Sequence, residues 1–537
     1  MKAKNLLLTV VMARSTMTEN LMKLIGISVL ITFLMLPFTA NAQFSGGDGS
    51  EGNPYIITTA AELAQLTTLV NVGNADYNGK YYKLNNDIDL SDYKTDIGWI
   101  PIGRYENSSF NGVFDGNSKK ITGLYISSTD GSYDGLFGYI KSATIKNLSI
   151  IDANIPSSYS SAGIVVGYMD NNSSVSNCYS TGSIISLYSS GYNYGYPYVG
   201  GVVGYNSGSV SNCYSFASVS TSASAYGAPA GGVAGGNNGS VSNCYSTGSV
   251  SSSGYNFSGG VVGLNDKNGT VSNCYSTGSV SSSGSSAGGV VGINSGGFVS
   301  SCYSTGVISS SEGYAWAGKY AGGVVGDETY AQNGSGTLYH GWVRSCAALN
   351  PSINRVGNND FYFGRIAGAD DPSTNGTLTN NIAFTNMLNP DNNTTWNNKS
   401  SSDKDGEDIN AQSINADGTL GGRFTSENGW TTQNGKLPGL FGNTVNMPEY
   451  LVGNNTGVVK PAQEVSDLII SPNPATDFIT VSGLQNNEMF YVYNINGQQL
   501  FSVKATGETQ QIPIGHLPAG IYFVKTSSGQ SLKWIKK

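Results

Sequence analysis

The chain has 537 residues, of which 39% are hydrophobic and only 12% are charged, with 72 glycines and a formal net charge of −8. A composition this polar excludes a bundle of membrane helices. The regular pattern of the sequence excludes a disordered chain. The acidic balance, with no basic cluster interleaved with aromatic residues, argues against nucleic acid as a partner. We therefore expect a multi-part extracellular protein.

Residues 1–42 match a secretory signal peptide. Lys23 precedes the apolar run LIGISVLITFLMLPF, and small residues follow up to Ala42. The Met-Lys pair ending at Lys23 would be a natural basic start, so residues 1–21 look like an over-extended start. We expect cleavage near Ala42 and no membrane-spanning segment in the mature chain; an uncleaved membrane anchor is the alternative.

Residues 43–150 are expected to cap and begin the fold. Thr59 and Glu62 have the spacing of a capping box, and the apolar residues that follow lie on one helical face. We predict that this short helix covers the open end of a stack of strands. From Tyr81 onward, short strand candidates separated by Asn, Asp and Gly predict irregular first coils.

Residues 151–390 repeat one phrase. The words GGVVG and VSNCYS recur in successive units, for example with their cysteines at Cys244 and Cys274. Glycine, serine, valine and tyrosine in short runs exclude a helical repeat. Each unit holds about three short β-capable runs, which suits a coil of three strands. We predict an all-β fold, a right-handed parallel β-solenoid.

A comparison of the units predicts which side chains face inward. Leu148 in the first unit stands where later units have Cys178 and its equivalents, so the cysteine position is expected inside. The asparagine before each cysteine breaks the alternation and marks a corner, where Asn tolerates a left-handed backbone. The same count places a row of tyrosines outside. These are Tyr179, Tyr214, Tyr245, Tyr275 and Tyr303.

The outer surface of the repeats is almost uncharged. Between Asn171 and Ser311 the only ionisable acid or base side chains are Asp266 and Lys267. Hydroxyls, amides and tyrosine rings must therefore make up most of this surface.

Six cysteines, one per unit from Cys178 to Cys346, would ordinarily suggest three disulfides in an exported chain. Residues in register on adjacent parallel strands lie about 4.8 Å apart, however, whereas the Cβ atoms of a disulfide lie about 3.8 Å apart. We favour free, buried thiols that act as small hydrophobic residues, with disulfides as the alternative.

An enlarged turn lies between Glu312 and Leu338. It carries Tyr314 and Trp316 among other aromatic residues, and is a candidate loop for contacting a partner. A padded loop without a partner is the alternative.

Residues 391–443 lose the repeat and are predicted to be the C-terminal cap of the solenoid. The run DKDGEDIN offers Asp403, Asp405 and Asp408 as oxygen ligands for calcium. Its glycine and a terminal Glu do not fall at EF-hand spacing, so a solvated acidic loop is preferred. We expect no cofactor.

Residues 444–466 have the composition of a linker. After them, residues 467–537 alternate strand candidates with Asn-Gly, Pro-Ala-Gly and Ser-Gly turns. This pattern predicts a small antiparallel β-sandwich of the Ig-like kind.

Two stretches resemble known families. The words NDIDL, FNGVFDGNSKKITGL, GGVVG and NCYSTG, within roughly residues 45–445, resemble GLUG-repeat surface proteins of the Bacteroidetes group. That resemblance implies a secreted or cell-surface protein, often adhesin-like, without an enzymatic residue set.

Residues 467–537 closely resemble the C-terminal sorting domain of the type IX secretion system. The matching positions include Pro472, Asn473, Pro474, Gly497, Gly520, Tyr522 and Lys536. The resemblance implies the type IX secretion machinery as a partner, passage through the outer membrane, and release or attachment at the cell surface.

The chain offers little catalytic chemistry. Its two histidines, His340 and His516, lie in different parts of the chain, so a histidine metal site or a Ser-His-Asp triad would require distant segments to meet. Some parallel β-helices are polysaccharide lyases or hydrolases with clustered carboxylates. The candidates here are Asp87, Asp89, Asp115, Asp130 and Asp134. The first three are more simply bend residues that cap backbone amides, and we expect no enzyme.

Two functional classes remain. The first is an adhesive surface protein that binds a host or bacterial glycan, or a surface protein, through the tyrosine row. The second is a structural stalk or surface-layer component, in which the same rings only stack on one another. The family resemblance favours the first, and a polysaccharide lyase or hydrolase ranks below both. An exposed row would favour binding, and a covered row would favour structure.

Overall fold

The computed structural model falls into two compact units, residues 1–454 and 455–537. The described residues are 43–127, 133–157, 160–186, 197–222, 227–254, 256–311, 320–329, 331–332, 338–339, 341–356, 362–369, 377–452, 469–471, 475–482, 484, 488–494, 499–507, 509–526 and 531–537. The signal peptide and its cleavage near Ala42 lie outside them and stay predictions. Within the described residues, no helix combines the length and apolarity that crossing a membrane requires.

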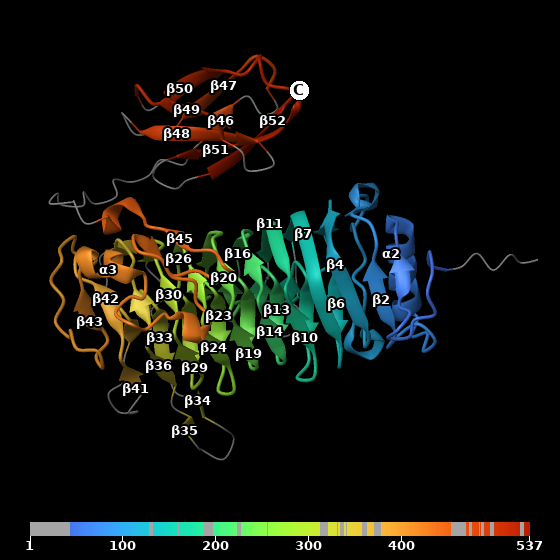
Figure 1. Cartoon of the computed structure of the whole chain (residues 1–537), viewed down its shortest axis with the longest axis horizontal. Coiled ribbons are helices and arrows are strands. Elements are labelled where there is room, and N and C mark those ends of the chain that lie inside the picture. Colours follow the sequence, from blue (N-terminus) through green and yellow to red (C-terminus); the bar gives the residue numbers. More distant parts are fainter. Residues whose placement is uncertain are drawn as a thin grey trace, which may run out of the picture. The chain divides into compact units, whose positions relative to one another are not determined.

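The first unit is a parallel β-solenoid, as predicted. Strands of successive coils lie side by side along one axis (Figure 1) and form three parallel stacks of 26, 7 and 8 strands. The 7-stranded stack is β8 (Ala162–Gly163), β12 (Val199–Gly200), β17 (Ala230–Gly231), β22 (Ser258–Gly259), β27 (Ser286–Gly288), β32 (Tyr320–Gly322) and β39 (Tyr362–Gly364). The 8-stranded stack is β6 (Phe137–Ile140), β9 (Val166–Met169), β13 (Val203–Asn206), β18 (Ala234–Asn237), β23 (Val262–Asn265), β28 (Val291–Ser295), β33 (Val325–Thr329) and β40 (Ala367–Ala369).

The 26-stranded stack holds the remaining strands of each coil. Its early members are β1 (Tyr55–Ile57), β2 (Tyr81–Leu84), β3 (Ile88–Asp89), β4 (Val113–Thr122), β5 (Tyr125–Ser127), β7 (Thr144–Ser157), β10 (Ser174–Ser176) and β11 (Tyr179–Ser186). The repeats add β14 (Ser209–Ser211), β15 (Tyr214–Ser215), β16 (Ser218–Ser222), β19 (Ser240–Ser242), β20 (Tyr245–Ser246), β21 (Val250–Ser253), β24 (Thr270–Ser272), β25 (Tyr275–Ser276) and β26 (Val280–Ser282). The last coils add β29 (Phe298–Ser300), β30 (Tyr303–Ser304), β31 (Ile308–Ser311), β36 (Trp342–Arg344), β37 (Ala347–Ala348), β38 (Ile353–Val356), β41 (Thr377–Thr379), β42 (Ile382–Phe384) and β43 (Glu407–Ile409).

Helix α2 (Ala60–Asn71) closes the N-terminal end of the solenoid (Figure 1). The Thr59 hydroxyl accepts a hydrogen bond from the Glu62 backbone N–H, and the Glu62 carboxylate accepts one from the Thr59 N–H. This reciprocal pair is the predicted capping box. Leu63, Leu66 and Val70 are fully buried in the solenoid core, so the predicted cap is confirmed.

The predicted corners also form. The asparagines before the cysteines have positive φ angles: 53° at Asn177, 54° at Asn212, 52° at Asn243 and 52° at Asn273. In the two later units a serine takes the same place, at 51° for Ser301. Each coil therefore turns at a left-handed residue that Asn tolerates better than most side chains.

Valine and cysteine fill the interior. Val210, Val241 and Val271 pair in register and are fully buried. All six cysteines are free and buried, as predicted, and each thiol donates to a carbonyl of its own unit, such as Cys244 Sγ to Ser242 O at 3.1 Å. The cysteines therefore act as small interior residues and not as cross-links.

The repeated glycines are required because neighbouring coils approach each other closely at these positions. A Cβ at Gly232 would lie 2.2 Å from the Gly260 carbonyl oxygen and 2.3 Å from the Ser246 hydroxyl. Both contacts are shorter than real Cβ atoms make. The coils can therefore nest only with glycine at this position of the GGVVG word.

A buried ladder of asparagines also runs along the 8-stranded stack. Asn206, Asn237 and Asn265 each donate their Nδ2 to the Oδ1 of the next asparagine in the ladder at 2.7 Å. Asn294, the last of them, donates to both oxygens of Glu328 at 3.1 and 2.9 Å. All four asparagines are fully buried. This buried ladder was not predicted from the sequence.

The C-terminal cap extends further than predicted. It contains α3 (Ala411–Asp417) and a hairpin of β44 (Lys436–Leu437) and β45 (Val445–Asn446). The Tyr450 hydroxyl contacts the carbonyl oxygens of Thr305 at 2.8 Å and Leu349 at 2.7 Å, and Leu451 is fully buried. The prediction of a linker over 444–466 is therefore wrong for residues 444–452. These residues belong to the cap, because Tyr450 and Leu451 attach them to the solenoid.

Four single-turn 3₁₀ helices and one side hairpin complete the elements described for this unit. They are η1 (Ser91–Tyr93), η2 (Glu106–Ser108), η3 (Ser426–Asn428) and η4 (Glu449–Leu451), and the antiparallel pair β34 (Ala331–Gln332) and β35 (Leu338–Tyr339).

The second unit is an antiparallel sandwich of two sheets, as predicted. One sheet is β46–β47–β50 and the other is β49–β48–β51–β52. Phe490, Val524 and Trp534 are fully buried between them. The strands are β46 (Ile469–Ser471), β47 (Phe478–Ser482), β48 (Met489–Asn494), β49 (Gln499–Lys504), β50 (Thr509–Pro513), β51 (Gly520–Thr526) and β52 (Ser531–Lys536).

The corner asparagines give a direct stability prediction. Replacing Asn243 with Ala should lower the free energy of unfolding by about 1 kcal/mol, because Ala pays the full cost of a left-handed backbone. Replacing it with Gly should change that free energy by less than about 0.5 kcal/mol. Urea unfolding of the exported chain measures both. Equal losses for the two variants would contradict the corner assignment.

The buried thiols predict a reactivity pattern. Burial raises the pKa of the Cys244 thiol well above its ordinary value, so little thiolate forms and reaction is slow. We expect 5,5′-dithiobis(2-nitrobenzoate) to label none of the six cysteines in the native chain and all six after unfolding in guanidinium. Fewer than six reactive thiols in unfolded, unreduced protein would instead indicate disulfides.

Candidate functional site

The tyrosine row predicted from the repeats forms a stack of rings on the outer face of the solenoid. Consecutive ring centroids from Tyr179 to Tyr214, Tyr245, Tyr275 and Tyr303 lie 4.8, 4.8, 4.7 and 5.1 Å apart. The planes of neighbouring rings differ by 22° or less. Because the strands pair in exact register, each ring must lie over its counterpart one coil away.

The C-terminal cap covers one half of this row. Trp430 packs against Tyr275 and Tyr303, with ring centroids 6.2 and 5.8 Å apart, and the Tyr303 hydroxyl donates to the Pro438 carbonyl at 2.6 Å. Tyr275 is only 5% exposed and Tyr303 is 0% exposed. These two rings point outward, as predicted, but they are covered, because a segment distant in sequence folds back over them.

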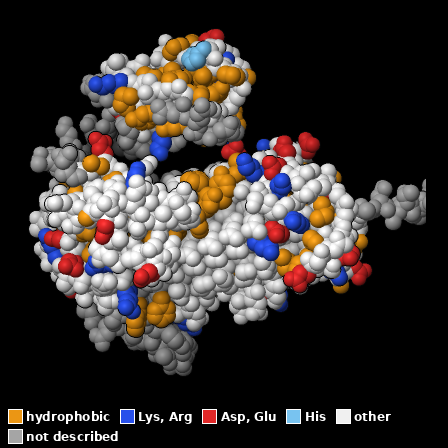
Figure 2. All heavy atoms as spheres, viewed as in Figure 1, with side chains coloured by type: hydrophobic (Ala, Val, Ile, Leu, Met, Phe, Trp, Pro, Cys, Tyr) orange, Lys and Arg blue, Asp and Glu red, His pale blue; other side chains and the backbone are white. Residues whose placement is uncertain are grey.

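The other half of the row stays accessible. Tyr179, Tyr214 and Tyr245 are half-buried, and Phe216 beside them is 45% exposed. The Phe216 ring stands edge-on to those of Tyr179 and Tyr214, at 5.8 Å and interplanar angles of 87° and 86°. Figure 2 shows a patch of hydrophobic side chains midway along the solenoid, over the strands around β16, with charged side chains gathered toward its two ends.

Phe216 is not among the site residues predicted from the sequence. The available signal was a departure from the repeat, since the unit reads CYSFAS where its neighbours read CYSTGS, with Thr247 in the next unit. A bulky apolar residue replaces a small polar one there without any interior space to fill.

Phe441 of the cap borders the open half. Its ring lies 6.0 Å from that of Tyr214 and 6.1 Å from that of Tyr245, and it is 44% exposed. Its backbone is left-handed, with φ at 59°, which is an outlier for a bulky side chain. The turn therefore holds Phe441 beside the row at a cost in backbone strain. We call Tyr179, Tyr214, Tyr245, Phe216 and Phe441 the open aromatic face.

A second tyrosine row, also missed, lies along the 8-stranded stack. The ring centroids of Tyr139, Tyr168 and Tyr205 are 4.9 and 4.8 Å apart, and Tyr198 packs against Tyr205 at 4.6 Å. Burial raises the pKa of Tyr168 and of Tyr205 to about 12, so both rings carry neutral hydroxyls at physiological pH.

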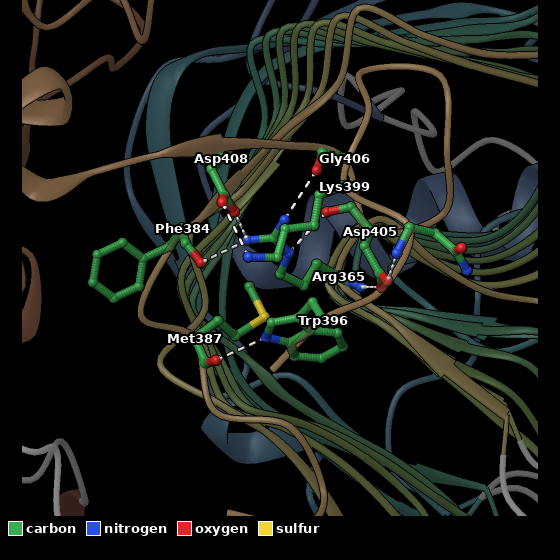
Figure 3. Close-up of polar contacts among 9 residues, drawn as sticks. Arg365, Phe384, Met387, Trp396, Lys399, Asp405, Gly406 and Asp408 are labelled. Carbon is green, nitrogen blue, oxygen red and sulfur yellow. Dashed lines mark hydrogen bonds and ion pairs between the residues drawn. The ribbon is translucent and has the colours of Figure 1, made fainter. Parts of the chain in front are cut away.

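The acidic run proposed for calcium serves a different purpose. Arg365 is fully buried at the C-terminal end of the solenoid (Figure 3) and donates to the carbonyl oxygens of Phe384, Asp405 and Gly406. Its Nη1 also pairs with Asp408 Oδ1 at 2.6 Å, and Lys399 Nζ lies 3.2 Å from the other Asp408 oxygen. Asp408 is therefore a counter-ion.

The other two carboxylates of the run are also engaged. Asp405 accepts the backbone N–H groups of Arg365 at 3.2 Å and Asn398 at 3.0 Å, and Asp403 accepts the Ser400 hydroxyl at 2.8 Å. Among the described residues there is no cluster of three or more His, Cys, Asp or Glu side chains that could hold a metal. The preference for a loop without calcium stays a prediction.

Three carboxylates of the first coils accept hydrogen bonds from backbone N–H groups, as predicted for bend residues. Asp87 accepts the Lys120 N–H at 2.9 Å, and Asp89 accepts both the Ser91 hydroxyl and its N–H at 2.6 and 2.9 Å. Asp115 accepts the Asn117 N–H at 2.8 Å. Asp134 is fully buried. The expectation that the protein is not an enzyme stays a prediction.

Several predicted site residues lie outside the described residues. They are Tyr314, Trp316, His340, Asp130, Pro472, Asn473, Pro474 and Gly497. Of the sorting positions that are described, Gly520 begins β51, and the Tyr522 ring stacks on Trp534 at 4.9 Å. Lys536 lies in the last strand, where it pairs with Gly520.

The geometry defines a protein made of a repetitive parallel β-solenoid and a small C-terminal β-sandwich. The family model of the GLUG motif matches residues 195–220 and 255–281, and that of the secretion system C-terminal sorting domain matches residues 470–537. The chain therefore carries GLUG motifs and a type IX secretion sorting domain. A tail of this kind implies export by the type IX secretion system to the cell surface or beyond.

Two curated proteins match the chain in part. A candidate Gly-rich membrane protein of Evansella cellulosilytica is 42% identical over 113 residues, which cover 20% of this chain and 12% of that protein. Halomucin of Haloquadratum walsbyi is 33% identical over 126 residues, which cover 23% of this chain and 1% of that protein. The chain thus spans a small fraction of the length of both relatives.

The chain also aligns with solved structures. A candidate immunoglobulin A1 protease from Bacteroides ovatus aligns at 21% identity and a TM-score of 0.40, over 75% of this chain and 97% of that one. Both values are low, and the likeness carries no conclusion about activity.

The Arg365–Asp408 pair predicts a pH dependence. Burial pushes the pKa of Asp408 up, but the hydrogen bond and charge of Arg365, joined by those of Lys399, outweigh it and hold the pKa below its ordinary value. A carboxyl group whose pKa is lower in the folded state than in the unfolded state stabilises the fold. This stabilisation is complete at a pH above the pKa of the unfolded state, near 3.9, and is lost as the pH falls through the pKa of the folded state.

Replacing Asp408 with Asn should therefore lower the free energy of unfolding by about 1–2 kcal/mol at pH 7, a figure reduced for the partial exposure of Asp408. The difference from the parent should shrink below about pH 4. Denaturant unfolding followed by tryptophan fluorescence measures it. Asp403→Asn is the matched control and should have little effect; a difference independent of pH would contradict the pairing.

Proposed function

We propose that this protein is a non-catalytic, adhesin-like binding rod, exported by type IX secretion and displayed at the cell surface or released from it. It binds a glycan through the open aromatic face. The observation that carries this proposal is the accessible arrangement of Tyr179, Tyr214 and Tyr245 with Phe216 standing edge-on beside them.

The chemistry of that face suits sugar rings. Aromatic faces stack on the apolar faces of sugars, and the surrounding hydroxyls and amides can exchange hydrogen bonds with sugar hydroxyls. The repeats around the face carry almost no charge, so nothing there favours an ionic partner. A left-handed Phe441 is further support, because backbone strain tends to persist at functional positions.

A structural stalk is the second candidate. The buried rings of Tyr275 and Tyr303 favour it, because that half of the row only stabilises the solenoid and anchors the cap. The two roles are compatible on one rod. They differ in whether the uncovered half binds anything.

A glycan array probed with residues 43–537 separates the two candidates. We expect binding to at least one glycan, and at least a tenfold loss in Phe216→Ser, because this exposed ring contributes contact area and little to the core. Phe298→Ser, which removes an exposed aromatic ring on β29, is the matched control and should bind like the parent.

Absence of binding by the parent, or unchanged binding by Phe216→Ser, would refute the role of the open aromatic face and leave the stalk. Depolymerisation of uronate polymers such as pectin or alginate by the parent would refute the non-catalytic assignment.

A further inference from the structure

A separate cleft lies at the C-terminal end of the solenoid, beside the Arg365 cluster. Its volume is about 330 Å³, at the lower end of the range for small-molecule sites. Its walls come from β39 and from the segment 389–398, for which the sequence suggested no binding role. None of the residues of the open aromatic face lines it.

Tyr362 supplies an aromatic surface to this cleft. Strand β39 is the last of the 7-stranded stack, so Tyr362 stacks on Tyr320 of the preceding coil, at 5.3 Å and 27°, and has no counterpart in a following coil. The Tyr362 residue is 57% exposed, the most exposed large aromatic residue of the described chain. One flat face is therefore available where the next ring of the row would lie.

An ordered loop supplies amide groups. Buried Asn389 holds the loop by accepting the N–H groups of Asp391 and Asn393 at 2.9 and 3.2 Å, while its Nδ2 donates to Asn393 Oδ1 at 2.8 Å. The Nδ2 groups of Asn393 and Asn397 donate to no described residue and both residues line the cleft. Two amide donors thus remain for a ligand in a preorganised loop.

Asp405 adds a buried acceptor. It is 3% exposed and lines the cleft. From the described residues, its Oδ1 accepts one hydrogen bond, from the Arg365 N–H, and its Oδ2 accepts one, from the Asn398 N–H. A carboxylate can accept about four, so acceptor capacity remains. Lys404 and Asp405 give the lining one charge of each sign, Asp391 is paired with Arg355 at 3.3 Å, and Arg365 is paired with Asp408. The cleft therefore has no excess positive charge to attract an anion.

We propose that this cleft binds a neutral sugar of about one or two rings. The sugar stacks one face on Tyr362 in place of the missing next ring, Asn393 and Asn397 donate to its oxygens, and Asp405 accepts from its hydroxyls. The site is distinct from the open aromatic face and stands even if that face binds nothing.

Saturation-transfer NMR on residues 43–537 tests the proposal with lactose, cellobiose, maltose and N,N′-diacetylchitobiose as probes. We expect at least one disaccharide to bind. Tyr362→Ala should weaken that binding about tenfold, whereas Tyr362→Phe should retain it, because stacking needs the ring and not the hydroxyl. Asn397→Ala, at an exposed position, should weaken it several-fold without affecting the unfolding midpoint.

Phe216→Ser is the matched control and should leave disaccharide binding in the cleft unchanged, which separates this proposal from the one for the open aromatic face. The proposal is overturned if no disaccharide binds, if Tyr362→Ala and Asn397→Ala both bind like the parent, or if EDTA abolishes binding, since a bridging cation would then hold the sugar.

Discussion

The structure of the first unit depends on in-register stacking of parallel strands. Each residue of a coil lies over its counterpart in the next coil, at the strand spacing of about 4.8 Å. Every repeated side chain must therefore tolerate a copy of itself above and below. Tyrosine rings stack at 4.7–5.1 Å, asparagines donate to one another, and valines and thiols pack. Charged side chains would repel their copies, which explains why residues 171–311 contain almost none.

The same constraint requires specific residues at the ends of the stacked rows, where no further coil follows. Each amide of the asparagine ladder donates toward the C-terminal end, and Glu328 ends the series because a carboxylate accepts hydrogen bonds without donating one onward. At the end of the solenoid, Arg365 satisfies three carbonyl oxygens with one side chain, and Asp408 balances its charge. At the other end, α2 presents an apolar face and a capping box.

The residues of the two proposed binding sites lie where the repeat is broken. Phe216 replaces a small polar residue of the unit, Phe441 comes from the cap, and Tyr362 is the last ring of its row. A strict repeat presents the same surface in every coil, whereas an irregular residue makes the surface of one coil different from that of its neighbours. In the same way, functional loops in other proteins are carried on regular scaffolds.

The sequence by itself determined the solenoid, the corners and the sandwich. Those features follow from local rules: repeated short strands, asparagine at left-handed corners, a capping box at Thr59 and turn residues between alternating strands. The inward position of the cysteines followed from one comparison, Leu148 with Cys178, because a shared position in a coil must face the same way.

Only the tertiary structure decided which rings are accessible. Residues 424–441 cover Tyr275 and Tyr303, more than a hundred residues away in sequence, and nothing in the repeat distinguishes those two rings from Tyr214. The buried Arg365 and the cleft beside Tyr362 likewise depend on a loop that leaves the solenoid and returns to its end. Periodicity determines how a coil stacks on its neighbour, but the path of a non-repetitive segment depends on which surface it can bury.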